Sequence, residues 1–216
     1  MMDDIVAPAS LNGRRAPRDV RRLQLIEATI DVLARKGYAA LTIADVAGAA
    51  GLSVGIVNFH FDSKDNLLAE CLRYLSTEYT NNWKMALAAA EPNTARRLEA
   101  VLLADFDAEL FTPRKIAAWI AFWGETQGRP VYNAICAELD AEHEKMVERL
   151  CGEIIAEGGY GHDPAITARA LESLGDGLWL GIGTWRPGTG TEFCPKKACV
   201  TFKSALAAYF PAHFRP

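Results

Sequence analysis

Histidines, the side chains that most often move protons in enzymes, are few in this chain and far apart. The four are His60, His143, His162 and His213. None belongs to an H-E-x-x-H motif or to a paired Glu-x-x-His motif, and no Gly-rich phosphate loop is present. The usual residue patterns of catalysis are therefore missing, and we expect that the protein is not an enzyme.

Acidic residues gather around one of these histidines. Glu138, Glu142, His143 and Glu144 fall close together on one predicted helix and carry atoms that can bind a metal ion. Charged runs on helices are more often a solvent-facing side, and we adopt that interpretation. No metal site and no cofactor are therefore expected.

Tryptophans are the other side chains whose chemistry could serve a function. Trp119, Phe122 and Trp123 occupy adjoining faces of one predicted helix, and Trp179 lies in a later one. Aromatic residues at helical spacing usually fill a core, although they can also line a ligand pocket. Periodicity alone favours the core.

The elements that position these residues are predicted to be helices. Half of the 216 residues are apolar, and glycines and prolines cluster between helical runs, with no sustained two-residue alternation. Breaks at 112–113, 128–130, 158–163 and 186–195 delimit the later helices. The sequence predicts an all-α fold of about nine helices.

The stretch 42–68 reads as two short helices joined by a tight turn. Ile43, Val46 and Ala50 recur at helical spacing, Gly51 suits a left-handed turn, and Ser53 is placed to cap the second helix. This pattern predicts a helix-turn-helix.

The domain organisation follows from this motif. Residues 1–17 are predicted to be a disordered basic arm, 18–62 a three-helix DNA-binding domain, and 63–216 a larger helical domain that includes a linker helix over 63–90. The family resemblance described below implies that this larger domain is regulatory and forms the dimer.

Charge is unevenly distributed along the chain. The net charge is −4, but residues 10–64 carry eight Lys or Arg against five Asp or Glu, and residues 76–216 carry fourteen against eighteen. Within the basic end, Arg21 and Arg22 are the candidates for phosphate contacts. The acidic start of the chain and the short apolar runs predict a cytoplasmic protein with no membrane partner.

The helix-turn-helix stretch resembles the TetR-type transcriptional repressors. Twelve positions fit the signature T-x-x-x-[IV]-A-x-x-A-G-[VL]-S-x-G-x-[LV]-Y-x-[YH]-F-x-[SN]-K-x-x-L, whereas Asn58 stands where most of the family has a phosphate-contacting Tyr. The resemblance implies double-stranded operator DNA as a partner, with phosphate contacts from Thr42, Asn58, His60 and Lys64 and base contacts from Val54, Gly55 and Phe59. Asn can also read adenine, and Phe59 could meet a thymine methyl group.

The later part of the chain is similar to the choline-responsive repressors of the BetI type. The similar segments are 106–109, 118–123 and 176–180. The resemblance implies a small-molecule effector, with a quaternary amine such as choline as the candidate. Such a ligand needs an aromatic cage and a counter-charge. The cage candidates are Trp119, Trp123 and Trp179, and the counter-charge candidates are Asp105, Glu109 and Glu125.

The final two helices bear on assembly. Leu171, Leu174, Leu178 and Ile182 form an apolar stripe, with glycines between them, and Val200 and Ala207 supply a second face. Small and apolar residues on paired helices suit a two-fold four-helix bundle, and the TetR resemblance puts a homodimer interface here. Packing within one chain is the alternative.

Two further functions stay open. A regulator of the same type could respond to a hydrophobic or drug-like ligand, and a pocket with no carboxylate near its aromatic residues would favour that version. The chain could also be a helical adaptor protein that binds no DNA.

Overall fold

The computed structural model describes residues 17–108, 110–184 and 194–214. Within these ranges the chain forms nine α-helices, two short 3-10 helices and no strand, which confirms the predicted all-α fold. The predicted basic arm, 1–17, lies outside them apart from Pro17.

The first three helices are α1 (Arg18–Ala40), α2 (Ile43–Ala50) and α3 (Val54–Phe61). Thr42 and Asp45 form a capping box, because each side chain accepts from the other's backbone N–H at 3.1–3.2 Å. Gly51 ends α2 in the left-handed conformation with φ 65°. Ser53 is the N-cap residue of α3, but its side chain makes no capping bond, so that part of the prediction is wrong.

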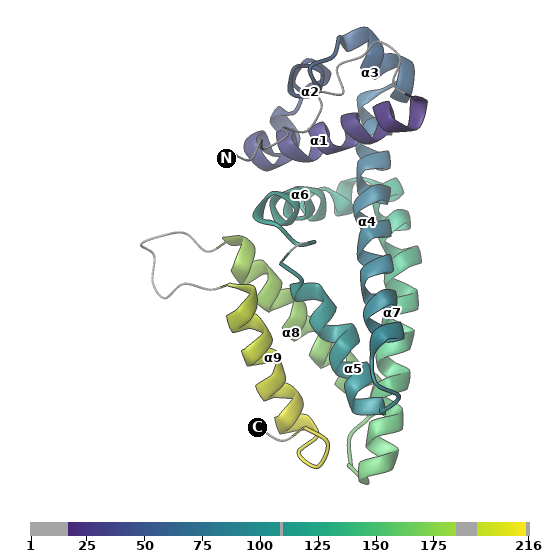
Figure 1. Cartoon of the computed structure of the whole chain (residues 1–216), viewed down its shortest axis with the longest axis vertical. Helices are drawn as coiled ribbons and strands as arrows, with labels where there is room; N and C mark the ends of the chain where they lie inside the picture. Colours follow the sequence, from purple (N-terminus) through teal and green to yellow (C-terminus); the bar gives the residue numbers. More distant parts are fainter. Residues whose placement is uncertain (1–16, 109, 185–193, 215–216) are drawn as a thin grey trace, which may run out of the picture.

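Helix α4 (Lys64–Ala89) connects this helical unit to the rest of the chain. The Ser63 hydroxyl accepts from the Asn66 N–H at 3.1 Å and caps the helix as expected. Its apolar stripe includes Leu67, Leu75 and Trp83, which are buried. In Figure 1, α4 runs from α1–α3 along the length of the molecule, beside α7.

The remaining helices build the larger unit. They are α5 (Thr94–Leu103), η1 (Ala104–Phe106), α6 (Pro113–Trp123), η2 (Thr126–Gly128), α7 (Pro130–Gly158), α8 (Pro164–Thr184) and α9 (Pro195–Tyr209). Proline opens α6, α7, α8 and α9, where its missing N–H costs no helical hydrogen bond. Figure 1 shows α6 crossing directly beneath α1, and α8 and α9 side by side.

Two apolar clusters form the interior. One joins α1–α4 to α6 and α7 through Ala118, Phe122 and Tyr132, and the other fills the space among α4–α9. Trp119 packs against both clusters. Helix α6 is therefore shared by the two halves of the molecule.

No single helix in the described ranges has the length and apolar character needed to span a membrane. Helices α2 and α3 have the required length and apolar character only when they are taken together, and they are bent by 108° with respect to each other.

Candidate functional site

Helix α3 presents an apolar face to solvent. The exposed fractions of Val54, Ile56 and Phe59 are 43%, 38% and 70%, and Gly55 and Asn58 are exposed beside them. Val57 and Phe61, on the opposite side of the helix, are completely buried. An eight-residue helix that exposes large apolar side chains together with one amide suits contact with base edges and thymine methyl groups in a major groove.

His60 lies differently from the phosphate-contacting position that the resemblance implies. Its side chain is buried, with 8% exposed, and its Nδ1 has no partner in the described chain. Burial lowers the pKa of this imidazole, and Arg18, Arg22 and Arg21 lower it further. A neutral, buried ring packs within the domain, so the phosphate assignment of His60 is corrected.

The basic side chains near α3 brace the domain. Arg22 donates to the His60 carbonyl at 2.9 Å, pairs with Glu70 at 2.8 Å and lies over the Phe61 ring. The Lys64 ammonium donates to the Leu41 carbonyl at 2.5 Å. Arg21 bonds Gln24 at 2.8 Å, and the exposed Thr42 side chain is held in the capping box. These groups therefore stabilise the helix-turn-helix in addition to any contact with DNA.

A second site is a partly open cavity of about 290 Å³ that is lined by residues of α4, α5, η1, α6, α7, α8 and α9. All three predicted cage tryptophans line it, together with the predicted counter-charge Asp105. The volume is near the lower end of the range for small-molecule pockets, which is about 300–1,000 Å³. Residues far apart in sequence thus meet in a site for a small ligand.

Aromatic rings follow one another across this cavity. Trp123 contacts Trp179 at 5.1 Å between ring centroids, Trp179 contacts Phe111 at 6.2 Å, and Phe111 contacts Tyr79 at 6.4 Å. Trp123 is 36% exposed, whereas Trp179 is 6% exposed. Because Trp123 and Trp179 touch each other, they form a wall on which a cation can rest rather than two faces that sandwich it.

The cavity is lined by five carboxylates against one histidine and one arginine. The carboxylates are Asp105, Asp140, Glu144, Glu172 and Asp176. Arg169 pairs with Glu144 at 3.0 Å, which leaves an excess of acidic groups. Burial raises the pKa of Asp105 to about 7 and that of Asp140 to about 6. The described lining favours a positively charged ligand.

His143 is the lining residue that sequence reasoning missed. It was assigned to a solvent-facing charged run, but the structure buries it to 5% exposure, against Tyr79 and Trp83. Its Nδ1 lies 3.6 Å from Glu172. Burial opposes the charged imidazole, but Glu172 and Asp105 outweigh it and raise the pKa of His143. The signal was present in the sequence, since His143 continues the helical stripe of Val147, Leu150 and Ile154.

One predicted counter-charge is not brought into the cavity, and another lies outside the described residues. The Glu125 carboxylate lies 3.5 Å from Arg129 and is not part of the lining, which corrects its assignment. Glu109 lies outside the described residues. The side chain of Glu138 also lies outside them, and no group of three or more metal-binding side chains occurs in the described part of the chain.

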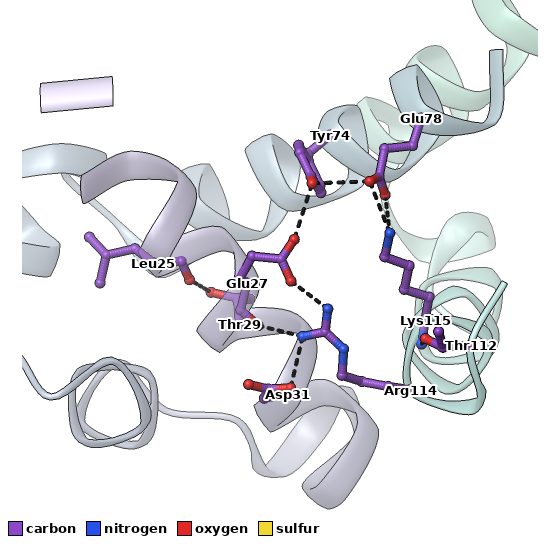
Figure 2. Close-up of polar contacts among 9 residues, drawn as sticks. All are labelled: Leu25, Glu27, Thr29, Asp31, Tyr74, Glu78, Thr112, Arg114 and Lys115. Atoms are coloured by element: carbon purple, nitrogen blue, oxygen red, sulfur yellow. Dashed lines mark hydrogen bonds and ion pairs between the residues drawn. The ribbon is translucent and has the colours of Figure 1, made fainter. Parts of the chain in front are cut away.

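A polar network joins the cavity-lining helix α6 to α1 and α4 (Figure 2). Arg114 donates to Asp31 at 2.8 Å and pairs closely with Glu27. The Tyr74 hydroxyl lies 3.1 Å from Glu27 and 3.0 Å from Glu78. The Lys115 ammonium, also on α6, donates to Glu78 at 2.7 Å. Helix α6 thus carries Arg114 and Lys115 near its start and two tryptophans of the cavity toward its end.

The predicted interface residues fall on α8 and α9 with different exposures. Leu171 is completely buried and packs inside the chain, so it is removed from the predicted interface. Leu174, Leu178, Ile182 and Ala207 are half-buried against the second apolar cluster, and Val200 is 61% exposed. The backbone of α8 approaches α6 closely at Gly183, where an added Cβ would lie 2.4 Å from Ile116. At Gly177 an added Cβ would have no neighbour within 4 Å.

Comparison with known proteins is consistent with this architecture. Residues 25–71 match the family described as bacterial regulatory proteins, tetR family, and residues 94–192 match the BetI-type transcriptional repressor C-terminal domain. The chain is 32% identical to the HTH-type transcriptional regulator BetI of Paraburkholderia phytofirmans over 76% of this chain and 82% of the relative. It is 30% identical to that of Serratia proteamaculans over 74% and 80%.

Solved structures share the fold. A putative transcriptional regulator from Pseudomonas aeruginosa PAO1 superimposes with a TM-score of 0.75 at 30% identity, over 95% of this chain and 99% of that chain. A putative transcriptional regulator from Saccharomonospora viridis in complex with choline gives a TM-score of 0.69 at 21% identity, over 86% and 95%.

Proposed function

Because this chain belongs to the TetR family of bacterial regulatory proteins and has the BetI-type C-terminal domain, we propose that this transcriptional regulator is a repressor controlled by a small organic cation. It binds a pseudo-palindromic operator as a homodimer, and the cation releases it. The observation that carries the proposal is the cavity whose lining combines a tryptophan wall with an excess of carboxylates.

DNA contact is proposed for the exposed face of α3. Val54, Gly55 and Phe59 approach base edges, and Asn58 either donates to a phosphate or reads an adenine. Thr42, Lys64, Arg21 and Arg22, which brace the same domain, are proposed to supply phosphate contacts in addition.

The effector is proposed to be a quaternary amine such as choline. The ring faces of Trp123 and Trp179 attract a cation that cannot donate hydrogen bonds, and Asp105 supplies a counter-charge. The choline complex of the Saccharomonospora viridis regulator, which has the same fold, supports testing choline first. A purely hydrophobic effector is disfavoured, because the lining contains several carboxylates. We found no observation that favours the adaptor alternative.

The route from cavity to DNA is proposed to run through α6. A ligand against Trp119 and Trp123 displaces this helix, and the Arg114 pairs with Glu27 and Asp31 pass the displacement to α1. In a dimer the two α3 helices must lie about 34–36 Å apart to enter successive major grooves, so a small change of spacing lowers operator affinity. The dimer is proposed to form through α8 and α9, with Leu174, Leu178, Ile182, Val200 and Ala207 at the interface.

The test is a DNA-binding titration of the purified protein against the region upstream of its own gene, at several salt concentrations, with and without choline. Sequence-selective binding that choline weakens supports the proposal. Selective binding that choline leaves unchanged rejects the effector, and the absence of selective binding rejects the operator function as well.

A further inference from the structure

The inner end of the cavity contains buried polar atoms with unused hydrogen-bonding capacity. Asp105 Oδ1 and His143 Nε2 are inaccessible to solvent and have no hydrogen-bond partner in the part of the chain that the structure describes. Glu172 Oε1 is also inaccessible and makes no hydrogen bond there, although it lies 3.6 Å from His143 Nδ1 in an ion pair. All three residues line the cavity, and the His143 side chain is more than nine-tenths buried. Unpaired buried oxygens are costly, so these carboxylates favour a ligand that supplies donors.

A quaternary ammonium group cannot meet this requirement. Its nitrogen carries four carbons and no N–H, and the hydroxyl group of choline can donate only one hydrogen bond. Asp105 belongs to η1 and Glu172 to α8, so the two carboxylate residues reach the lining of the cavity from different elements. A primary ammonium group has three donors and one positive charge, which suits two carboxylate oxygens together.

The other end of the cavity offers a different surface. A row of rings runs from Tyr79, the neighbour of Asp105, through Phe111 and Trp179 to the half-exposed Trp123. Asp140 and Asp176 also line the cavity and are more exposed than the inner carboxylates. The lining therefore presents an apolar, cation-attracting surface at one end, a set of acceptors at the other, and enough acidic groups for two positive charges.

We propose that the ligand of this cavity is a short dication whose primary ammonium group donates to Asp105 and Glu172 while an alkylated ammonium rests on Trp123 and Trp179. This inference rests on the proposed function, since it assumes that the cavity is the effector site. It specifies an amine that bears N–H groups, a chemistry that choline lacks.

The experiment compares two probes that differ in one functional group. (3-Hydroxypropyl)trimethylammonium and (3-aminopropyl)trimethylammonium have the same quaternary head and spacer, and the amine of the second is protonated at neutral pH. Calorimetric titration of the full chain at pH 7.5 should show that the amine binds at least about tenfold more tightly than the alcohol, because it adds charge-assisted hydrogen bonds.

Variants test whether Asp105 and Glu172 are the residues that cause the preference for the amine probe. Asp105→Asn and Glu172→Gln keep side-chain size and should remove most of the preference for the amine. Glu125→Gln is the matched control, because Glu125 pairs with Arg129 outside the cavity, and it should retain the preference.

The outcomes separate this inference from the proposed function. If the alcohol binds and the amine binds no better, the dication is rejected and a quaternary-amine effector stands. If the amine is preferred equally in Asp105→Asn, Glu172→Gln and the wild type, the assigned contacts are rejected. If neither probe binds, the cation-effector function fails and the dication fails with it.

Discussion

Asp105 is the side chain whose protonation most directly sets the charge of the cavity. Burial raises its pKa to about 7, and Asp140 has a pKa of about 6 for the same principal reason. The pKa values of Asp176 and His143 are also raised, whereas Tyr79 stays protonated because its pKa lies well above the usual value. Near neutral pH the lining is therefore only partly ionised.

This titration predicts a pH-dependent affinity for any cationic ligand. As the pH rises from about 5.5 to 8, Asp105 and Asp140 gain negative charge, and both changes favour a cation. Choline affinity should rise about tenfold or more over this range. Calorimetry at several pH values measures it, and Asp105→Asn should flatten the profile. An affinity that falls with rising pH would reject the electrostatic account.

Phe59 gives a second test at the level of one residue. Its ring is 70% exposed, so Phe59→Ala should leave the unfolding midpoint nearly unchanged. If the ring contacts base methyl groups, operator affinity should fall about tenfold with no change in the salt slope, because no charge is removed.

Met85 provides the matched control for this substitution. It is 64% exposed on α4, outside the helix-turn-helix, and Met85→Ala should bind operator like the wild type. Equal affinity of Phe59→Ala and Met85→Ala would exclude Phe59 from the DNA contact.

Among the elements, α6 touches both halves of the molecule and also lines the cavity. Its apolar residues belong to both core clusters, and Arg114 ties its start to Glu27 and Asp31 of α1 (Figure 2). The Arg114 pair is about one-third exposed, so its significance lies in the connection it makes more than in its contribution to stability.

Arg114→Gln should therefore weaken the coupling between the effector cavity and the DNA-binding face of α3. We expect choline affinity within about threefold of the wild type, with a smaller effect of choline on operator binding. Parallel calorimetry and DNA titration measure the two quantities. Arg149→Gln, which removes a surface pair with Glu153 on α7, is the control and should leave coupling intact. Full coupling in Arg114→Gln would show that the signal takes another route.

The elements also show what could be read from the sequence. Helix α2, its turn and α3 were predictable because Thr42, Gly51 and the spacing of Val46 and Ala50 are local signals. The inner end of the cavity was not, because Asp105, His143 and Glu172 come from η1, α7 and α8 and meet only through tertiary packing. The resemblance to the BetI type made the tryptophans candidates, but it could not show that Glu125 pairs with Arg129 instead of facing them.

At the scale of the whole molecule, the proposed recognition of a pseudo-palindromic operator needs two copies of this chain at a fixed spacing. Val200 is 61% exposed on α9, in the pair of helices proposed as the interface. Val200→Glu should place like charges opposite each other across a two-fold axis and produce monomers with greatly weakened operator binding.

Light scattering after size exclusion measures this outcome. Val131→Glu is the control, because Val131 is 48% exposed on α7, outside the proposed interface, and this variant should remain dimeric. A Val200→Glu dimer with normal operator affinity would move the interface elsewhere.

The central claim is that a cation in the tryptophan-lined cavity releases the protein from DNA. Its most direct test is the fluorescence anisotropy of a labelled operator, titrated with choline, for the wild type and for Trp123→Ala. Trp123 is 36% exposed, and its loss should not affect the fold. The account predicts equal operator affinity without ligand, release of the wild type, and a choline midpoint at least about tenfold higher in the variant. Identical midpoints, or no release of the wild type at any choline concentration, would contradict it.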